Sequence, residues 1–348
     1  MLQFSIKKKM RLVNSLTLFL TVVPIFAESN VRPGWTEQAP IGRGPRQEES
    51  ITSLGTDMYI IGGIPGQPPY PTLDWVEVFS ATSNKWRNAS SLPTTINHGN
   101  VAAVHGKIYI LGGLSGPSVW TAIGGCYEYD PRHDTWKTLH STMPNGTARG
   151  ASAVGVYGST IYIAGGLTLL NVFTGAQPTV DIVTSYNTKT QEWTTLPCLP
   201  EGRDHVGGVV MKNIFYVVGG RINGIANVRN TVFAMDLSDS SPKWIEKATM
   251  PTARGGLSVA AVGSKIYAFG GEGERALVPN GVYDNLEVYD TISDSWETLP
   301  PMPFPRHGTS AASIGSRIYV PGGGNITAAG PQDRNDFYQT QSVHGHIP

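Results

Sequence analysis

Arginine, histidine and carboxylate residues recur along the sequence shortly before glycine pairs. Five arginines lie 16 residues before the first glycine of such a pair, namely Arg46, Arg149, Arg203, Arg254 and Arg306. Close to these positions stand Glu48, His98, Asp204, His205 and His307. Guanidinium groups bind carboxylate or phosphate through paired hydrogen bonds, and imidazole and carboxylate groups exchange protons near neutral pH. The pattern predicts either a polar ligand site, which would include His98 and Asp204, or a structural arginine in each repeat.

Further candidate residues follow the glycine pairs. Glu272 comes directly after one pair and Arg275 three residues later, where they could act as a base and an anion clamp. Together with His205 and His307 they are the catalytic candidates, and we expect Glu272 and His307 to matter for function while barely affecting folding. Trp120 belongs to another of these segments and could stack on the face of a sugar ring.

Motifs that would name a reaction are missing from the sequence. It contains no Gly-x-Ser-x-Gly, no His-Glu-x-x-His and no P-loop. Residues 271–276 match a dinucleotide fingerprint in form, but they lead into Val-Pro-Asn-Gly and not into a helix. We therefore expect no cofactor and no metal, and the sequence leaves open whether the protein is an enzyme.

The N-terminus has the features of a signal peptide. Basic residues at 7–9 and 11 precede a mostly apolar run over 12–26, and a small residue follows at Ala27. The run is short for a membrane span, so we expect residues 1–27 to be removed and the mature chain, 28–348, to be secreted or lumenal without a membrane span. Removal takes away four basic residues, which leaves 22 basic against 26 acidic ones. This balance argues against nucleic acid as a partner.

Sequons and cysteines fit an extracellular protein without naming its function. Asn88, Asn145 and Asn325 each begin an Asn-x-Ser/Thr sequon and are predicted glycosylation sites. Only two cysteines occur, Cys126 and Cys198, so the fold is not a disulfide framework. They could form one disulfide between adjacent repeats or remain two free thiols, and the sequence does not decide between these states.

An internal repeat predicts the fold. A β-branched and aromatic run closes on a glycine pair six times, with second glycines at Gly63, Gly113, Gly166, Gly220, Gly271 and Gly323. A Tyr-Asp segment, a tryptophan and a proline-rich turn follow in most copies. Gly is 41 of 348 residues, well above the usual share, which is typical of many short strands and turns. Repeats of about 50 residues with four strands each indicate the blades of a β-propeller.

The two ends of the chain predict how the ring closes. The sixth glycine pair is followed by a Tyr-containing strand but by no tryptophan strand, whereas Trp35 stands alone near the mature N-terminus. We therefore expect the segment around Trp35 to supply the outer strand of the last blade, which removes an exposed sheet edge. The prediction is an all-β, six-bladed propeller with four antiparallel strands per blade, forming one domain over 28–348.

These repeats resemble the kelch family over essentially all of residues 34–348. Among kelch proteins, secreted copper-radical oxidases need a Tyr-His pair that this chain lacks, which argues against copper. A secreted six-bladed sialic-acid mutarotase is similar in size and uses a Glu and an Arg near the mouth, a role that Glu272 and Arg275 could match. Secreted fungal kelch proteins that accompany small-molecule biosynthesis are a further resemblance.

Strand order predicts which face carries function. In an antiparallel meander, the long loops after the glycine pairs and the starts of the innermost strands lie on the same face. We expect a monomeric binding module that takes a small polar molecule, a glycan or a protein on that face. The alternative is an isomerase, mutarotase or cyclase that uses acid and base residues in the mouth of the propeller. A tight cluster of Glu and His around a deep pocket would favour the enzyme.

Overall fold

Each repeat forms one four-stranded antiparallel sheet, because its β-branched and aromatic runs are separated by turns that only tight loops can bridge. The computed structural model describes residues 34–341 apart from 275 and 277, and these residues belong to the compact unit Arg32–Pro348. The predicted signal peptide and Arg275 lie outside the described residues. Within the described part of the chain, no helix has the length and apolarity needed to cross a membrane.

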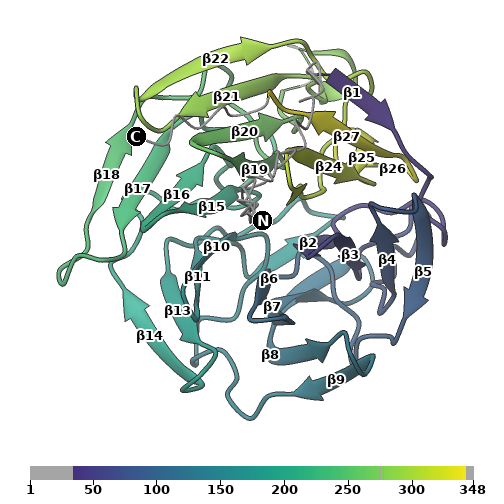
Figure 1. Cartoon of the computed structure of the whole chain (residues 1–348), viewed down its shortest axis with the longest axis horizontal. Coiled ribbons are helices and arrows are strands. Elements are labelled where there is room, and N and C mark those ends of the chain that lie inside the picture. The colour runs from purple at the N-terminus through teal and green to yellow at the C-terminus, as the bar shows by residue number, and fades with distance from the viewer. Residues whose placement is uncertain (1–33, 275, 277, 342–348) are drawn as a thin grey trace, which may run out of the picture. The chain divides into compact units, whose positions relative to one another are not determined.

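Six sheets surround a centre as the blades of a propeller, which confirms the predicted fold (Figure 1). From the innermost strand outwards, blade 1 consists of β2 (Ser50–Leu54), β3 (Asp57–Ile61), β4 (Val76–Ser80) and β5 (Lys85–Ala89). Blade 2 consists of β6 (Val101–Val104), β7 (Lys107–Ser115), β8 (Val119–Asp130) and β9 (Thr135–Thr138). Blade 3 consists of β10 (Ala153–Tyr157), β11 (Thr160–Ala164), β13 (Val183–Asn187) and β14 (Glu192–Leu196). Blade 4 consists of β15 (Gly207–Met211), β16 (Ile214–Val218), β17 (Val232–Asp236) and β18 (Trp244–Lys247). Blade 5 consists of β19 (Ser258–Val262), β20 (Lys265–Phe269), β21 (Leu286–Asp290) and β22 (Ser295–Leu299). Blade 6 consists of β23 (Ala312–Ile314), β24 (Arg317–Pro321), β27 (Asn335–Gln339) and β1 (Gly34–Glu37).

Short additional elements decorate the long-loop face. Strand β12 (Leu169–Asn171) comes from the loop of blade 3 and pairs with β8 of blade 2, so it ties two blades together. A hairpin of β25 (Gly324–Ile326) and β26 (Ala329–Pro331) lies in the loop of blade 6, and a 3₁₀ turn, η1 (Pro279–Gly281), lies in the loop of blade 5.

The N-terminal strand closes the ring as predicted. Strand β1 pairs antiparallel with β27, with Trp35 opposite Tyr338. The Trp35 ring also packs edge-on against Phe269 of blade 5, with ring centroids 5.6 Å apart. The first described strand therefore completes the last blade, which has four strands like the others.

Apolar side chains fill every interface between neighbouring blades. Each of the six interfaces has its own cluster of buried residues, and the tryptophans of the outer strands pack against five of them and Trp35 against the sixth. Close backbone approach at these interfaces requires the glycine pairs. At Gly62, with φ of 67°, a Cβ atom would lie 2.1 Å from the carbonyl oxygen of Ile96 in the next blade. An alanine cannot occupy this position without moving a blade.

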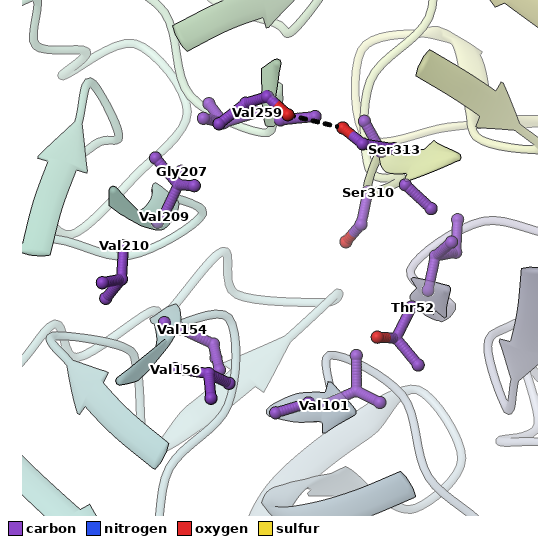
Figure 2. Close-up of a pocket in the computed structure, with 18 of the residues that line it drawn as sticks. Thr52, Val101, Val154, Val156, Gly207, Val209, Val210, Val259, Ser310 and Ser313 are labelled. Carbon is purple, nitrogen blue, oxygen red and sulfur yellow. Dashed lines mark hydrogen bonds between the residues drawn. The ribbon is translucent and has the colours of Figure 1, made fainter. Parts of the chain in front are cut away.

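The innermost strands leave a narrow tunnel along the centre. Its volume is about 430 Å³, and small aliphatic and hydroxyl side chains line it, such as Val101, Val154, Val259 and Ser310 (Figure 2). None of the lining residues is charged. The chemistry-bearing residues identified in the sequence lie outside this tunnel.

Candidate functional site

A ring of backbone hydrogen bonds lies where the six innermost strands begin. Five N–H groups each donate to the carbonyl of another blade, from Glu48 to Gly308 (2.6 Å), His98 to Glu48 (2.9 Å), Ala151 to His98 (2.9 Å), Gly256 to His205 (2.8 Å) and Gly308 to Gly256 (3.0 Å). All six residues of this ring have left-handed backbone conformations, with φ between 47° and 61°. This conformation is costly for residues other than glycine. The chain nevertheless places an alanine, a glutamate and two histidines there, and the three ionisable residues among them are functional candidates.

A cavity of about 460 Å³ lies on the long-loop side of this ring, and we call it the mouth cavity. The mouth cavity and the central tunnel have no lining residue in common. Residues of the ring line a third, smaller void, and its lining includes residues of both the cavity and the tunnel. Glu48, His98, His205, Arg221 and Glu272 gather at one part of its lining, and we call these five residues the floor cluster.

Apolar and aromatic side chains supply another part of the lining, and the Trp120 ring lies beside His98 with ring centroids 6.1 Å apart. Tyr70 and Phe173 come from the loops of blades 1 and 3, Trp120 from the start of β8 and Leu170 from β12. The Trp120 ring is buried and its Nε1 donates to the Tyr70 carbonyl at 3.2 Å, which fixes the orientation of this ring. Phe173 is 77% exposed at the rim, where little of the protein covers it. The cavity thus combines an apolar wall with a charged floor.

The two histidines of the floor cluster point their Nε2 atoms at each other. Asn97 donates its amide N–H to Thr72, so its Oδ1 accepts from His98 Nδ1 at 2.6 Å. The Asp204 carboxylate accepts from His205 Nδ1 at 2.7 Å. With both Nδ1 atoms committed as donors, the two Nε2 atoms face each other at 3.0 Å. Two neutral rings would place lone pair against lone pair, so the arrangement needs a proton or another cation there.

Carboxylates surround this histidine pair. Glu48 Oε2 lies 3.0 Å from His98 Nε2. Arg221 donates to Asp204 (3.2 Å) and to Glu272, and its Nη2 lies 3.0 Å from His205 Nε2. Behind the cluster, His307 Nδ1 lies 3.5 Å from the Glu272 carboxylate, and Ala328 N–H donates to the same group at 2.8 Å. A single buried guanidinium therefore joins two buried carboxylates and one imidazole.

Electrostatics keeps the carboxylates of this network ionised. Burial by itself would raise the pKa of Glu48, but His98 above all, with His205 and His307, holds that pKa below its ordinary value. The pKa values of Glu272 and Asp204 are also lowered against the effect of burial, by His307 and Arg221 for Glu272 and by His205 and Arg221 for Asp204. The pKa of His205 is lowered, first by burial and then by Arg221. Carboxylate oxygens and an imidazole lone pair are therefore the groups offered here.

The structure brings together six of the residues predicted from the sequence. His98, His205, Glu272 and Trp120 line the mouth cavity, while Asp204 and His307 support them from behind. Glu272 and His307 are 1% and 0% exposed and belong to the buried network. Removing either residue leaves a buried charge with fewer partners, so from their burial we expect both to contribute to folding, unlike the expectation from the sequence.

The five repeated arginines lie inside the blades and do not line the mouth cavity. Arg149 donates to the carbonyls of Gly165 (2.7 Å) and Ile163 (2.9 Å), and Arg254 donates to Glu287 (2.5 Å) and to the Ala268 carbonyl (3.1 Å). The others form the same kind of contact, Arg46 with Glu77, Arg203 with Glu201 and the Gly219 carbonyl, and Arg306 with Asp336 and the Val320 carbonyl. Of the two interpretations of the pattern, these contacts fit the structural one.

Several residues of the cavity are not among the site residues predicted from the sequence. Glu48 and Arg221 complete the floor cluster, and Gln47 and Gln177 line the cavity with side-chain oxygens that are buried without a hydrogen-bond partner. A signal for Glu48 exists in the repeat itself. The second residue after each repeated arginine is Gly or Ala in three blades, so a charged residue at this position stands out once the repeats are aligned.

The cysteines are free in the structure, so the disulfide left open by the sequence is absent. Cys126 is buried in β8, where burial raises its pKa to about 12, whereas Cys198 is exposed after β14. The three sequon asparagines, Asn88, Asn145 and Asn325, are all exposed.

Comparison with known proteins agrees with this architecture. A model described as the KLHDC2/KLHL20/DRC7 Kelch-repeats domain matches residues 168–343, and a Kelch motif model matches residues 50–93 and 97–141. The chain belongs to the kelch-repeat family. Its six blades carry the kelch pattern on both halves of the ring.

This chain spans less than two thirds of the length of two curated kelch relatives. Kelch-like protein terF of Aspergillus terreus is 40% identical over 291 residues, which cover 82% of this chain and 62% of that protein. Human Kelch-like protein 34 is 27% identical over 266 residues, 71% of this chain and 38% of that protein. The solved structure of YjhT superposes with a TM-score of 0.70 at 16% identity, covering 85% of this chain and 95% of that one. This last likeness shows the shared fold.

Proposed function

We propose that this kelch protein binds a small neutral molecule in the mouth cavity, one that carries hydroxyl or N–H groups on an apolar or aromatic body. The observation that carries the proposal is the cavity itself, whose volume of about 460 Å³ falls within the range of small-molecule sites. Its lining combines aromatic side chains with hydrogen-bond acceptors. Kelch propellers serve as binding or scaffold modules, and this cavity is where the present chain offers a specific site.

The polar groups of the cavity select for donors on the ligand. The Oε1 atoms of Gln47 and Gln177 are buried without a partner, which is costly unless something supplies an N–H or O–H. The orientation of Gln47 is set because its Nε2 donates to the Ala328 carbonyl at 3.2 Å. The carboxylate of Glu48, with its side chain 11% exposed, adds another acceptor. A ligand hydroxyl satisfies any of these groups.

Anionic ligands fit this cavity poorly. Arg221 is the arginine in its lining, and both Asp204 and Glu272 already share its guanidinium group. The repeated arginines that could have formed a positive funnel lie inside the blades. We therefore favour neutral hydroxylated compounds, including glycosides, over sugar acids or phosphates.

Secretion and glycosylation are part of the same proposal. The predicted signal peptide and the three exposed sequon asparagines support a glycosylated protein outside the cell or in the secretory lumen. A ligand site on such a protein would meet molecules of the extracellular space.

A thermal-shift screen followed by calorimetry tests the binding proposal. The compounds are neutral hydroxylated aromatics and glycosides, each paired with a carboxylated or phosphorylated analogue. We expect neutral members to bind, Trp120→Ala to weaken binding about 10-fold or more, and Ile292→Ala, an exposed site on an outer turn, to leave it unchanged. Binding that Trp120→Ala does not alter, or binding of the anionic analogues alone, would overturn the proposal.

The second candidate function is acid–base catalysis on the bound molecule. The specific observation in its favour is the tight cluster of Glu48, His98 and His205 at the floor of a cavity with apolar walls. Such groups isomerise or cyclise substrates by moving a proton. Mass spectrometry and NMR of each binding compound, incubated with the protein, would detect conversion. The catalytic hypothesis requires that Glu48→Gln stop conversion while the compound still binds, and equal conversion by that variant would remove it.

A further inference from the structure

We propose that Glu48, His98 and His205 form a binding site for a divalent transition-metal ion such as Zn²⁺ at the floor of the mouth cavity. The sequence had predicted no metal, since no ligand spacing along the chain suggests one. The three residues come from three different blades, and the ring at the propeller centre brings them together. The inference concerns the ion itself and does not depend on which small molecule the cavity accepts.

The distances between the donor atoms suit one ion. The two Nε2 atoms are 3.0 Å apart, Glu48 Oε2 lies 3.0 Å from His98 Nε2, and the three donor atoms are all within 4.8 Å of one another. An ion with metal–ligand bonds of about 2.0–2.2 Å holds neighbouring ligand atoms about 3 Å apart. Two imidazoles and one carboxylate are a ligand set used for Zn²⁺ and for Fe²⁺, and three protein ligands leave a coordination position free.

The groups behind the histidines hold them as metal ligands are held. A metal-binding imidazole usually donates its other N–H to a carboxylate or carbonyl oxygen, which fixes the ring and its tautomer. Here His205 donates to the buried Asp204 carboxylate, and His98 donates to the Asn97 amide oxygen. Thr179 and Thr72 in turn hold Asp204 and Asn97. Both Nε2 atoms thereby keep a lone pair, and they lie 3.0 Å apart.

The charge of the surrounding groups also favours a cation. Glu48, Asp204 and Glu272 contribute three carboxylates, while Arg221 contributes one positive charge, and all but Glu48 are at most 2% exposed. With neutral histidines the group carries a net charge of minus two. Burying uncompensated charge is expensive, so two further positive charges are needed. A divalent ion supplies both at once.

Arg221 is the group that opposes the ion. Its Nη2 lies 3.0 Å from His205 Nε2 and donates to the lone pair that the ion would take. The ion must displace this one N–H. Arg221 keeps its ion pairs with Asp204 and Glu272, and these two carboxylates balance its positive charge. We therefore expect the guanidinium to shift within its pair of carboxylates when the ion binds.

Metal titration tests the inference. It uses the mature chain, 28–348, made without a polyhistidine tag and stripped of metal with a chelator. Zn²⁺ is followed by calorimetry and Co²⁺ by its visible absorption, which reports nitrogen and oxygen coordination. We expect one ion per chain and a loss of affinity of about 100-fold or more in His98→Ala and in Glu48→Gln. Asp204→Asn should lose about 10–100-fold, since it acts through His205.

Control variants separate this site from other histidines. His140→Ala, at an exposed position, and the double change His344→Ala with His346→Ala, in the C-terminal tail, should bind like the wild type. Circular dichroism shows whether each variant is folded. The inference is overturned if the wild type binds no ion tighter than about 100 µM, or if folded His98→Ala and Glu48→Gln bind as tightly as the wild type. In the first case a proton alone lies between the rings. The small-molecule screen is also repeated in the presence of chelator, so that its result tests the binding proposal independently of the ion.

Discussion

Glu49 is a carboxyl group in an unfavourable place. It is 3% exposed, and neither of its oxygens has a partner at hydrogen-bonding geometry. Burial raises its pKa to about 8, although Arg46 acts in the opposite direction. Its neighbour Glu48 has a lowered pKa because of the histidines beside it. Two adjacent glutamates thus differ in ionisation because one faces the imidazoles and the other faces the blade interior.

Glu49→Gln should make the protein less sensitive to pH. The folded-state pKa of Glu49 lies above its unfolded value, so its contribution favours folding below the unfolded pKa and is lost as the pH rises towards 8. A shift of this size corresponds to about 3 kcal/mol between pH 5 and pH 8. Urea denaturation at both pH values should show this loss in the wild type and a smaller one in Glu49→Gln. The exposed Glu297→Gln is the control, and an equal pH dependence in both variants would contradict the prediction.

Arg254 should contribute to stability and not to ligand binding. It is fully buried and donates to Glu287, which is itself 1% exposed. Arg254→Ala leaves that buried carboxylate without a positive partner and should cost about 3–5 kcal/mol in urea denaturation, whereas Arg254→Met with Glu287→Leu should recover most of the loss. Arg87→Ala, which breaks an exposed pair with Asp57, should cost less than about 1 kcal/mol. A cost below about 1 kcal/mol for Arg254→Ala would show that the repeated arginines are not structural.

At the scale of elements, β1 decides whether the ring is closed. Trp35 connects this strand to Tyr338 in its own blade and to Phe269 in the blade before it. Trp35→Ala should therefore destabilise the whole propeller by about 3 kcal/mol, which chemical denaturation measures. Thr36→Ala, on the exposed side of the same strand, should have little effect. A small loss for Trp35→Ala, or separate unfolding of one blade, would mean that β1 is dispensable.

The whole molecule places its three sequon asparagines at the surface. Asn88 lies in β5, Asn145 in the loop after β9 and Asn325 in β25, and all three are exposed to a transferase. Protein secreted by eukaryotic cells should therefore lose mass on glycosidase treatment, and its N-terminus should lie near Glu28. Changing all three asparagines to glutamine should abolish the mass shift. An unchanged wild-type mass would remove the glycan, and a retained Met1 would remove the signal peptide.

Fold-level features were predictable because they repeat. Six glycine pairs, the tryptophans that follow them and the unpartnered Trp35 predicted the blades and the closure of the ring. The glycine pairs recur because every blade interface needs the same close approach, and a repeated steric requirement leaves a visible pattern. For the same reason the repeated arginines were visible, but repetition itself could not tell a structural role from a ligand site.

The sequence by itself determined the six-bladed architecture, the closing strand and the face that carries the long loops. Only the tertiary structure decided that the arginines lie inside the blades and that Glu48, His98 and His205 meet at the centre. These three residues are separated by 50 and 107 positions along the chain, from 48 to 98 and from 98 to 205. Their meeting depends on the left-handed ring that joins the starts of the inner strands. Contacts across a propeller axis arise once per molecule, so no local periodicity records them.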